Sequence, residues 1–297
     1  MSLFHTLKFV ANHPLNRERR IGSLIGFVKW QIGSRLAPGP IVYSWIEGSR
    51  FIVTPGETGL TGDIYCGLHE FSEMAYLLHV IGPDDLFVDI GSNVGSYTIL
   101  ACAVKGAKGY CFEPVPATFR RLMDNIRIND LSNRVKAFNV GIADKEGELV
   151  FTAGENCTNH VIPEGEKSTD VVRVKVLPLD TILEGQTPSA LKIDVEGLET
   201  LVLRGAQVTL HSPSLHSVIM ELNGIGTKRY GFSEDEILKT MKGYGFSTYI
   251  YEPFSKHLES LDGKQNAFGN ALFIRDERVV QDIITKSSPV RIGHTLL

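Results

Sequence analysis

From residue 86 onward, short apolar runs alternate with amphipathic segments, and this alternation limits what the chain can fold into. The runs "LFVDIG", "GYCFEP", "ALKIDVEG" and "HSVIMELN" are almost continuously apolar, which is typical of strands covered on both faces. Helical patterns such as "PATFRRLMDNIRIND" and "SEDEILKTMKGYG" stand among them. Strands that alternate with helices predict an α/β fold with a mostly parallel sheet and helices on both faces.

Further strands complete this pattern. The segments "GELVFTA" and "DVVRVKVLPLD" predict a hairpin pair joined by the polar loop 154–169, and "FSTYIYEP" and "NALFIRD" close the series. Long polar loops are often lids over a binding cleft. His160 lies in this loop, and we expect it to contact a substrate there.

The first residues differ in character from the rest. Residues 1–36 hold six lysines and arginines against one acid, Glu18. The segment "RRIGSLIGFVKWQIGSRL" has apolar residues at helical spacing, and "IVYSWIEGSRFIVTPG" predicts a hairpin that turns at Gly48. The helix either packs on the main domain with its basic residues in water, or forms a basic surface for anionic lipid or an anionic substrate. We expect an N-terminal extension (1–64), a main domain (65–280) and a C-terminal tail (281–297).

Composition excludes several classes of protein. The net charge of −4 gives no general attraction to nucleic acid. The four cysteines form no CxxC pair, so we expect reduced thiols in a cytoplasmic protein without zinc or disulfides. The chain has no secretory signal pattern and no run of eighteen apolar residues, so any membrane contact would be peripheral, through residues 1–36 at the inner membrane face.

The stretch "FVDIGSNVGSYTILA" (87–101) joins the first of these strands to a helix. Gly91 and Gly95 allow a sharp turn and a close ligand, and ligands of such sheets bind at the carboxyl ends of the strands. No Lys-Ser/Thr pair follows the glycines, so this is not a P-loop. Asp89 would repel a pyrophosphate. A cation that carries a sulfonium and an α-ammonium group fits better.

Glu113 ends the next strand, twenty-two residues after Gly91. An acid at this place accepts hydrogen bonds from ribose hydroxyls. NAD would use the same feature, so an NAD-dependent oxidoreductase stays open here, although Asn93 stands between the two glycines and residue 96 is not glycine. A non-catalytic nucleotide-binding module or partner subunit is the other alternative.

Acids also follow the later strands. Asp194 and Glu196 end "LKIDVEG", and residues two apart share one side of a strand, so both carboxylates are expected in one cleft. Glu196 could instead cap the next helix. Glu221 and Asn223 end the following strand, where they could bind a substrate. Two acids are a thin ligand set, so no metal is expected.

Three blocks of this sequence, "FVDIGSNVGSYTILA", "FEPVPATFRRLMDNIRIN" and "LKIDVEGLETLVLRGA", resemble the signature blocks of the FkbM-type methyltransferases. The resemblance covers about residues 65–275. It implies a Rossmann-like class I methyltransferase with a seven-stranded sheet. It also implies that S-adenosylmethionine is the cofactor and that the methyl group passes to a hydroxyl of a sugar, a glycan or a secondary metabolite, by in-line displacement.

The resemblance also implies roles for individual residues. It assigns the methionine part of the cofactor to the loop residues Asp89, Gly91, Ser92, Asn93 and Gly95, with Ser96 and Tyr97 nearby. It assigns the ribose to Glu113 and the adenine to Ala143 and Asp144. From the residues themselves, Asp194, Glu196 and His69 are candidate general bases, Glu221 is a further one, and Glu70 is a candidate partner for the cofactor's ammonium group.

Overall fold

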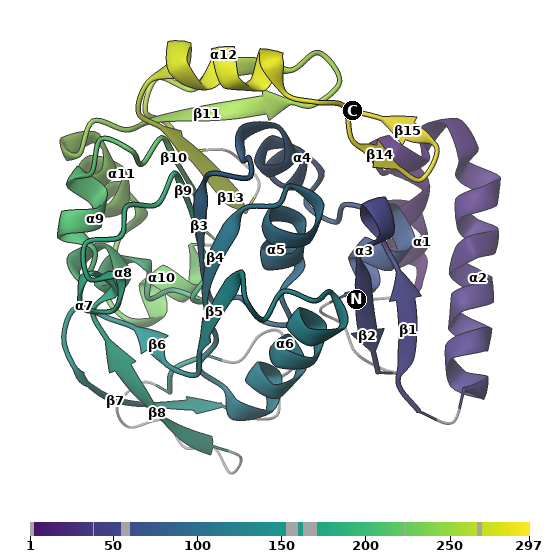
Figure 1. The fold of residues 1–297 in the computed structure, drawn as a ribbon, viewed down its shortest axis with the longest axis horizontal. Coiled ribbons are helices and arrows are strands. Elements are labelled where there is room, and N and C mark those ends of the chain that lie inside the picture. The colour runs from purple at the N-terminus through teal and green to yellow at the C-terminus, as the bar shows by residue number, and fades with distance from the viewer. Residues whose placement is uncertain are drawn as a thin grey trace.

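The computed structural model describes residues 3–37, 39–54, 60–152, 160–162, 171–222, 224–265 and 269–297. Their main element is one twisted sheet of eight strands (Figure 1). From edge to edge these strands are β12 (His257–Ser260), β11 (Ser247–Glu252), β13 (Asn270–Ile274), β10 (Ser217–Glu221), β9 (Ala190–Ile193), β3 (Leu86–Ile90), β4 (Lys108–Phe112) and β5 (Val135–Phe138).

The sheet is parallel over its five strands from β10 to β5 and antiparallel where β13, β11 and β12 are added. The predicted mostly parallel α/β fold is therefore confirmed. The sheet has one strand more than the predicted seven, because β12 pairs with β11 at the edge. Its sequence, "HLES", is short and polar, as edge strands often are, and so gives no strand pattern.

Helices cover both faces of the sheet because each central strand is apolar on both sides. In β3, Phe87 packs with one hydrophobic cluster and Val88 with the other. One face carries α4 (Phe71–Val80), α5 (Ser96–Ile99) with its π-helical extension Leu100–Val104, α6 (Pro116–Ile128) and α12 (Glu277–Lys286). The other face carries α7 (Leu179–Leu183), α8 (Glu199–Arg204), α9 (Gln207–His211) and α11 (Glu234–Gly243).

A small second sheet lies beside the carboxyl edge of the main one. It contains β6 (Gly141–Ile142), β8 (Val171–Leu177) and β7 (Gly147–Thr152) in that order. The predicted hairpin pair is confirmed, since β7 and β8 are antiparallel. Phe151 and Val174 of this sheet pack with Leu198, which precedes α8. A further short helix, α10 (Ile225–Arg229), follows β10.

The N-terminal region consists of α1 (Leu3–Asn12), a 3₁₀ helix at Pro14–Arg19, α2 (Arg20–Leu36), the hairpin of β1 (Ile41–Ser44) and β2 (Arg50–Val53), and α3 (Thr61–Cys66). Phe51 and Val53 of the hairpin belong to the main core. Asn125 of α6, fully buried, accepts a hydrogen bond from Ile52 N at 2.8 Å and donates one to Val94 O at 2.8 Å. The hairpin is thereby joined to the glycine loop. None of the described helices has the length and apolar character needed to cross a membrane.

The C-terminal residues, expected to form a tail, pack on the domain instead. Residues 277–286 form α12, and β14 (Arg291–Ile292) pairs with β15 (Thr295–Leu296). Ile292 and Leu297 are buried in the main core, and Arg291 N donates to Glu47 Oε1 at 2.9 Å. The sequence does carry a helix signal here, because Val279, Val280, Ile283 and Ile284 recur at helical spacing. The strands β14 and β15 have two residues each and give no strand pattern.

Candidate active site

The glycine loop follows β3 at the point where β3 and β9 lie side by side. The N–H groups of Gly91 and Ser92 both donate to Phe112 O, at 2.9 and 3.0 Å. Gly91 has a φ of 79°, and a Cβ there would stand 1.7 Å from the carbonyl oxygen of Asp194. Asn93 and Gly95 also have positive φ values, 50° and 98°. Only glycine fits at Gly91, so the loop brings the bare backbone against the end of β9.

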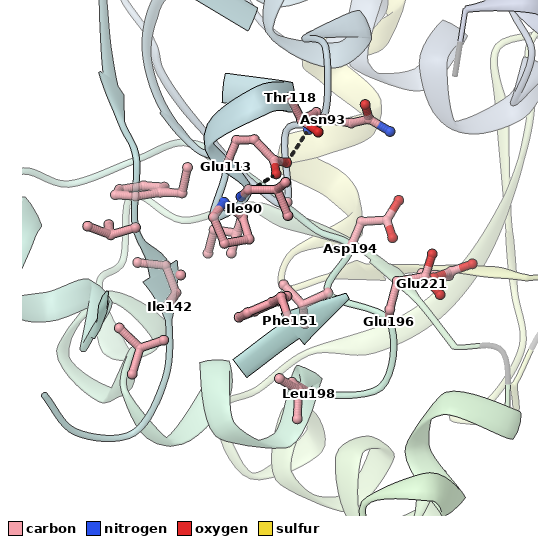
Figure 2. A pocket seen from close by; sticks show the side chains of 18 of the residues that line it. Ile90, Asn93, Glu113, Thr118, Ile142, Phe151, Asp194, Glu196, Leu198 and Glu221 are labelled. Carbon is pink, nitrogen blue, oxygen red and sulfur yellow. Dashed lines mark hydrogen bonds between the residues drawn. The ribbon is translucent and has the colours of Figure 1, made fainter. Parts of the chain in front are cut away.

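A cavity opens beside this loop, at the carboxyl ends of β3, β4, β9 and β10 (Figure 2). Its apolar part is lined by Ile90, Phe112, Pro114, Val115, Val140, Ile142, Leu149, Phe151, Val176, Val195 and Leu198. Five carboxylates also line it: Glu70, Glu113, Asp194, Glu196 and Glu221. The strand order reverses between β3 and β9, and ligands of open α/β sheets bind at such a point.

Glu113 directly follows β4, and two backbone N–H groups hold its carboxylate in place. Its Oε2 accepts from Asn93 N at 3.0 Å and its Oε1 from Val115 N at 2.9 Å (Figure 2). Burial raises the pKa of Glu113 to about 8, and these two hydrogen bonds act in the opposite direction. Each carboxylate oxygen keeps a second lone pair, so Glu113 can still accept from a ligand hydroxyl.

Asp89 and Ser92 lie beneath the loop, away from the cavity wall. Asp89 is 2% exposed, and its Oδ2 accepts from Thr98 Oγ1 at 2.6 Å. Burial raises the pKa of Asp89 to about 6. Ser92 Oγ bonds the backbone at Asp89 and Phe112. The structure therefore gives both residues a role in shaping the loop, and their direct contact with a ligand stays a prediction.

Gly95, Ser96 and Tyr97 begin α5 and also lie off the cavity wall. Ser96 Oγ donates to Asp63 Oδ2 at 2.8 Å, and Tyr97 Oη donates to Glu70 Oε2. Burial raises the pKa of Asp63 to about 6. Among these groups Glu70 alone lines the cavity, as predicted for a partner of a ligand ammonium group.

The residues predicted to meet the adenine, Ala143 and Asp144, are not among those that line the cavity, and their contact with adenine stays a prediction. Ala143 is buried, with its N–H donating to Leu177 O at 3.0 Å, and Asp144 is exposed. Gly141 and Ile142 line the cavity instead. The chain after β5 forms the short strand β6, which shifts the residues that face the cavity.

The carboxylate of Asp194 is paired with a buried cation, Lys192. Lys192 is 2% exposed, and its Nζ lies 3.1 Å from Asp194 Oδ2 and 3.3 Å from Asn270 Oδ1. The same Nζ lies 5.2 Å from the centre of the Tyr97 ring. Burial alone would lower the pKa of Lys192, but the carboxylates of Asp194, Glu70 and Glu221 raise it, so the lysine stays charged.

Asp194, Glu196 and Glu221 meet at the acidic end of the cavity (Figure 2). One carboxylate oxygen from each lies within 4.8 Å of the others. Burial raises the pKa of Glu196 to about 7 and, with the nearby Asp194, that of Glu221 to about 9. Glu221 Oε2 is buried without a hydrogen-bond partner. Glu221 therefore holds a proton at neutral pH, and Lys192 is paired with Asp194. That the site works without metal stays a prediction.

The predicted histidines differ in position. His69 lines the cavity. Its backbone N–H donates to Asp63 Oδ1 at 2.9 Å, and the centre of its ring lies 5.3 Å from that of Phe9. His160 is paired to the strand residue Thr152 through its backbone and is not among the lining residues. Asn223 and most of the polar loop 154–169 lie outside the described residues.

The sequence reasoning missed Lys192, Thr98 and Asn125. A lysine within the apolar run "ALKID" is the clearest overlooked signal, because a charge in a doubly covered strand needs a buried partner. Thr98 stands in an apolar helix, and Asn125 is one of many polar residues in "RRLMDNIRIND", so no motif singles out either.

Comparison with known proteins places this chain among methyltransferases. The family model described as "Methyltransferase FkbM domain" matches residues 89–248. The hexuronic acid methyltransferase AglP of Haloferax volcanii is 29% identical over 180 residues, 59% of this chain and 68% of that protein. Methyltransferase 1 of Beauveria bassiana is 31% identical over 166 residues, 47% of this chain and 66% of that protein.

A solved structure, the precorrin-6y C5,15-methyltransferase of Geobacter metallireducens, has a TM-score of 0.41 at 12% identity, over 75% of this chain and 93% of that one. The family match spans more than half of the chain and contains the glycine loop, Glu113 and the acidic end of the cavity. This chain therefore belongs to the FkbM methyltransferase family, with the Rossmann-like class I fold.

Proposed function

We propose that this chain is an S-adenosylmethionine-dependent O-methyltransferase that acts on a hydroxyl of a sugar, a glycan or a secondary metabolite. The observation that carries the proposal is one cavity at the strand-order reversal, in which Glu113 stands at one side and the Lys192-paired Asp194 at the other. AglP, named for a hexuronic acid, supports a carbohydrate acceptor.

The described residues fit this cofactor. Five acidic side chains line the cavity, and a bound sulfonium and ammonium group would favour their ionised forms, whose pKa values burial raises at Glu113, Glu196 and Glu221. We assign the ribose hydroxyls to Glu113, the adenine to the apolar wall that contains Ile142 and Phe151, and the ammonium to Glu70. The bare backbone at Gly91 leaves room for the methionine part. When bound, S-adenosylmethionine supplies a methyl group on a positively charged sulfur, which is a good leaving group.

Asp194 is the candidate general base. Its carboxylate lines the cavity and is 33% exposed on the side chain, so an acceptor hydroxyl can reach it. Lys192 forms an ion pair with Asp194 at 3.1 Å, and protonated Glu221 can donate a hydrogen bond to the acceptor. A positioned base contributes about 10²–10⁴-fold to such a reaction. Alignment of the two reactants supplies roughly 7–11 kcal/mol more.

Calorimetry and a transfer assay test the proposal. We expect micromolar binding of S-adenosylhomocysteine and none of NADH, and transfer of labelled methyl from S-adenosylmethionine to at least one member of a panel of free and glycosidic sugars. Tight NADH binding without a signal from S-adenosylhomocysteine would favour an oxidoreductase. Cofactor binding without transfer to any hydroxyl would favour a non-catalytic module. That nucleic acid is not the acceptor stays a prediction, and RNA belongs in the same assay.

A further inference from the structure

The outward face of α2 carries an apolar stripe that the described residues leave uncovered. Its members are separated by four, three, four and four residues, which places them on one side of the helix. They are Ile21, Ile25, Val28, Ile32 and Leu36, with exposed fractions of 77%, 50%, 49%, 57% and 78%. Isolated exposed apolar residues are ordinary, but a continuous stripe of five marks a surface that meets an apolar partner.

The opposite face of α2 fixes the helix on the domain, so the stripe is not simply a face that failed to pack. Phe27 is 5% exposed, and its ring centre lies 4.7 Å from that of Tyr65 in α3. Gln31 Nε2 donates to Tyr65 Oη, and Trp30 packs edge-on against Tyr43 of β1. In Figure 1, α2 stands at the outer edge of the molecule, away from the main sheet.

Positive charge borders the stripe. At about 100° per residue, Lys29 falls on one side of it and Arg35 on the other, and both are exposed. The described residues 3–37 hold four more exposed cations, Lys8, Arg17, Arg19 and Arg20, against one acid, Glu18. A surface with an apolar centre and a cationic border matches the headgroup region of an anionic bilayer.

We propose that this face of α2 docks on an anionic lipid bilayer, with the helix lying in the plane of the interface. Charge decides between this partner and a second copy of the chain. Two copies that met through the same face would bring their cations together, whereas acidic headgroups would neutralise them. The proposal does not depend on the chemistry of the cavity, because no residue of the stripe lines it.

Vesicle co-sedimentation of the full chain tests the proposal. We expect binding to vesicles of phosphatidylcholine mixed with phosphatidylglycerol, weaker binding at high salt, and little binding to phosphatidylcholine alone. The double variant Ile25→Asp/Ile32→Asp should bind at least about tenfold more weakly. The matched control Val208→Asp/Val279→Asp adds the same charge at exposed apolar positions on α9 and α12, and should bind as the wild type does.

Thermal unfolding of each variant checks that the fold is intact. Wild-type protein that ignores anionic vesicles, or an Ile25→Asp/Ile32→Asp variant that binds them as well as the wild type does, would overturn the proposal. A concentration-dependent dimer in sedimentation velocity that this variant abolishes would overturn it too, and would assign the face to a second copy.

Discussion

The ammonium nitrogen of Lys192 lies 3.1 Å from Oδ2 of Asp194, and the two residues differ sharply in exposure. Lys192 is 2% exposed, whereas 33% of the Asp194 side chain meets solvent. The buried ammonium of Lys192 thus depends on Asp194 to compensate its charge, while the carboxylate of Asp194 faces the cavity and solvent.

Removing the charge of Asp194 should destabilise the protein more than removing that of Lys192. Asp194→Asn leaves a buried cation with weaker compensation, and we expect a loss of about 3 kcal/mol in the free energy of unfolding. Lys192→Met should lose less, because Asp194 can be hydrated. The double variant should be more stable than Asp194→Asn alone. Urea unfolding measures all three, and the reverse order would contradict the asymmetry.

The same substitution tests the proposed base. At a temperature where the protein is folded, Asp194→Asn should lower kcat for methyl transfer by about 10²–10⁴-fold while the affinity for S-adenosylhomocysteine changes little. Glu196→Gln, at a group that burial already favours in its neutral form, should lower kcat less. Wild-type turnover in Asp194→Asn would remove Asp194 as the base.

Gly91→Ala should be far more damaging than Gly185→Ala. Both glycines have positive φ, 79° and 83°. A Cβ at Gly185 meets nothing within 4 Å, so its cost is the backbone strain alone, of order 1 kcal/mol. At Gly91 the Cβ would stand 1.7 Å from Asp194 O, and we expect at least about 3 kcal/mol more. Equal unfolding midpoints for the two variants would refute the close approach of β3 and β9.

Glu113→Ala should weaken the binding of S-adenosylhomocysteine, since each hydrogen bond lost to a ribose hydroxyl contributes about 0.5–1.5 kcal/mol. Asp144→Ala should leave the affinity unchanged, because Asp144 is exposed and does not line the cavity. Isothermal calorimetry compares the two. A larger effect at Asp144 would restore the adenine assignment that the sequence suggested.

The unliganded protein should lose stability as the pH rises from about 4.5 to about 9. The pKa of Glu221 rises from an ordinary 4.5 to about 9 in the fold, so the folded state binds the proton more tightly than the unfolded state. This stabilisation is complete below pH 4.5 and is lost as the pH passes 9. Glu221→Gln, neutral at every pH, should lose less of its free energy of unfolding over this range. If the free energies of unfolding of the wild type and Glu221→Gln change with pH in the same way, the raised pKa of Glu221 is excluded.

The order of strands and helices was predictable because the central strands are apolar on both faces. This pattern can be recognised in each strand's own sequence, without knowing which strands lie beside it. The cavity residues Gly91, Asn93, Glu113, Asp194 and Glu221 were found for the same reason, since each follows a recognisable strand. The position of Asp89 beneath the loop was not predictable, because its contact with Thr98 depends on how α5 turns back over β3; its contact with the cofactor stays a prediction. Lys192 was missed although Asp194 follows two residues later, because its second partner, Asn270, comes from β13 and is far away in the sequence.

The amide of Asn125 has a consequence for how this chain can be shortened. The amide oxygen of Asn125 accepts from Ile52 N in the hairpin, and the amide nitrogen donates to Val94 O in the glycine loop. A fragment that begins at residue 65 would keep every residue that lines the cavity. It would lack Ile52 N, the donor to the buried Oδ1 of Asn125. The described residues among the first sixty-four therefore brace the glycine loop, and trimming them would loosen a site that they support through Ile52, Asp63 and Phe9.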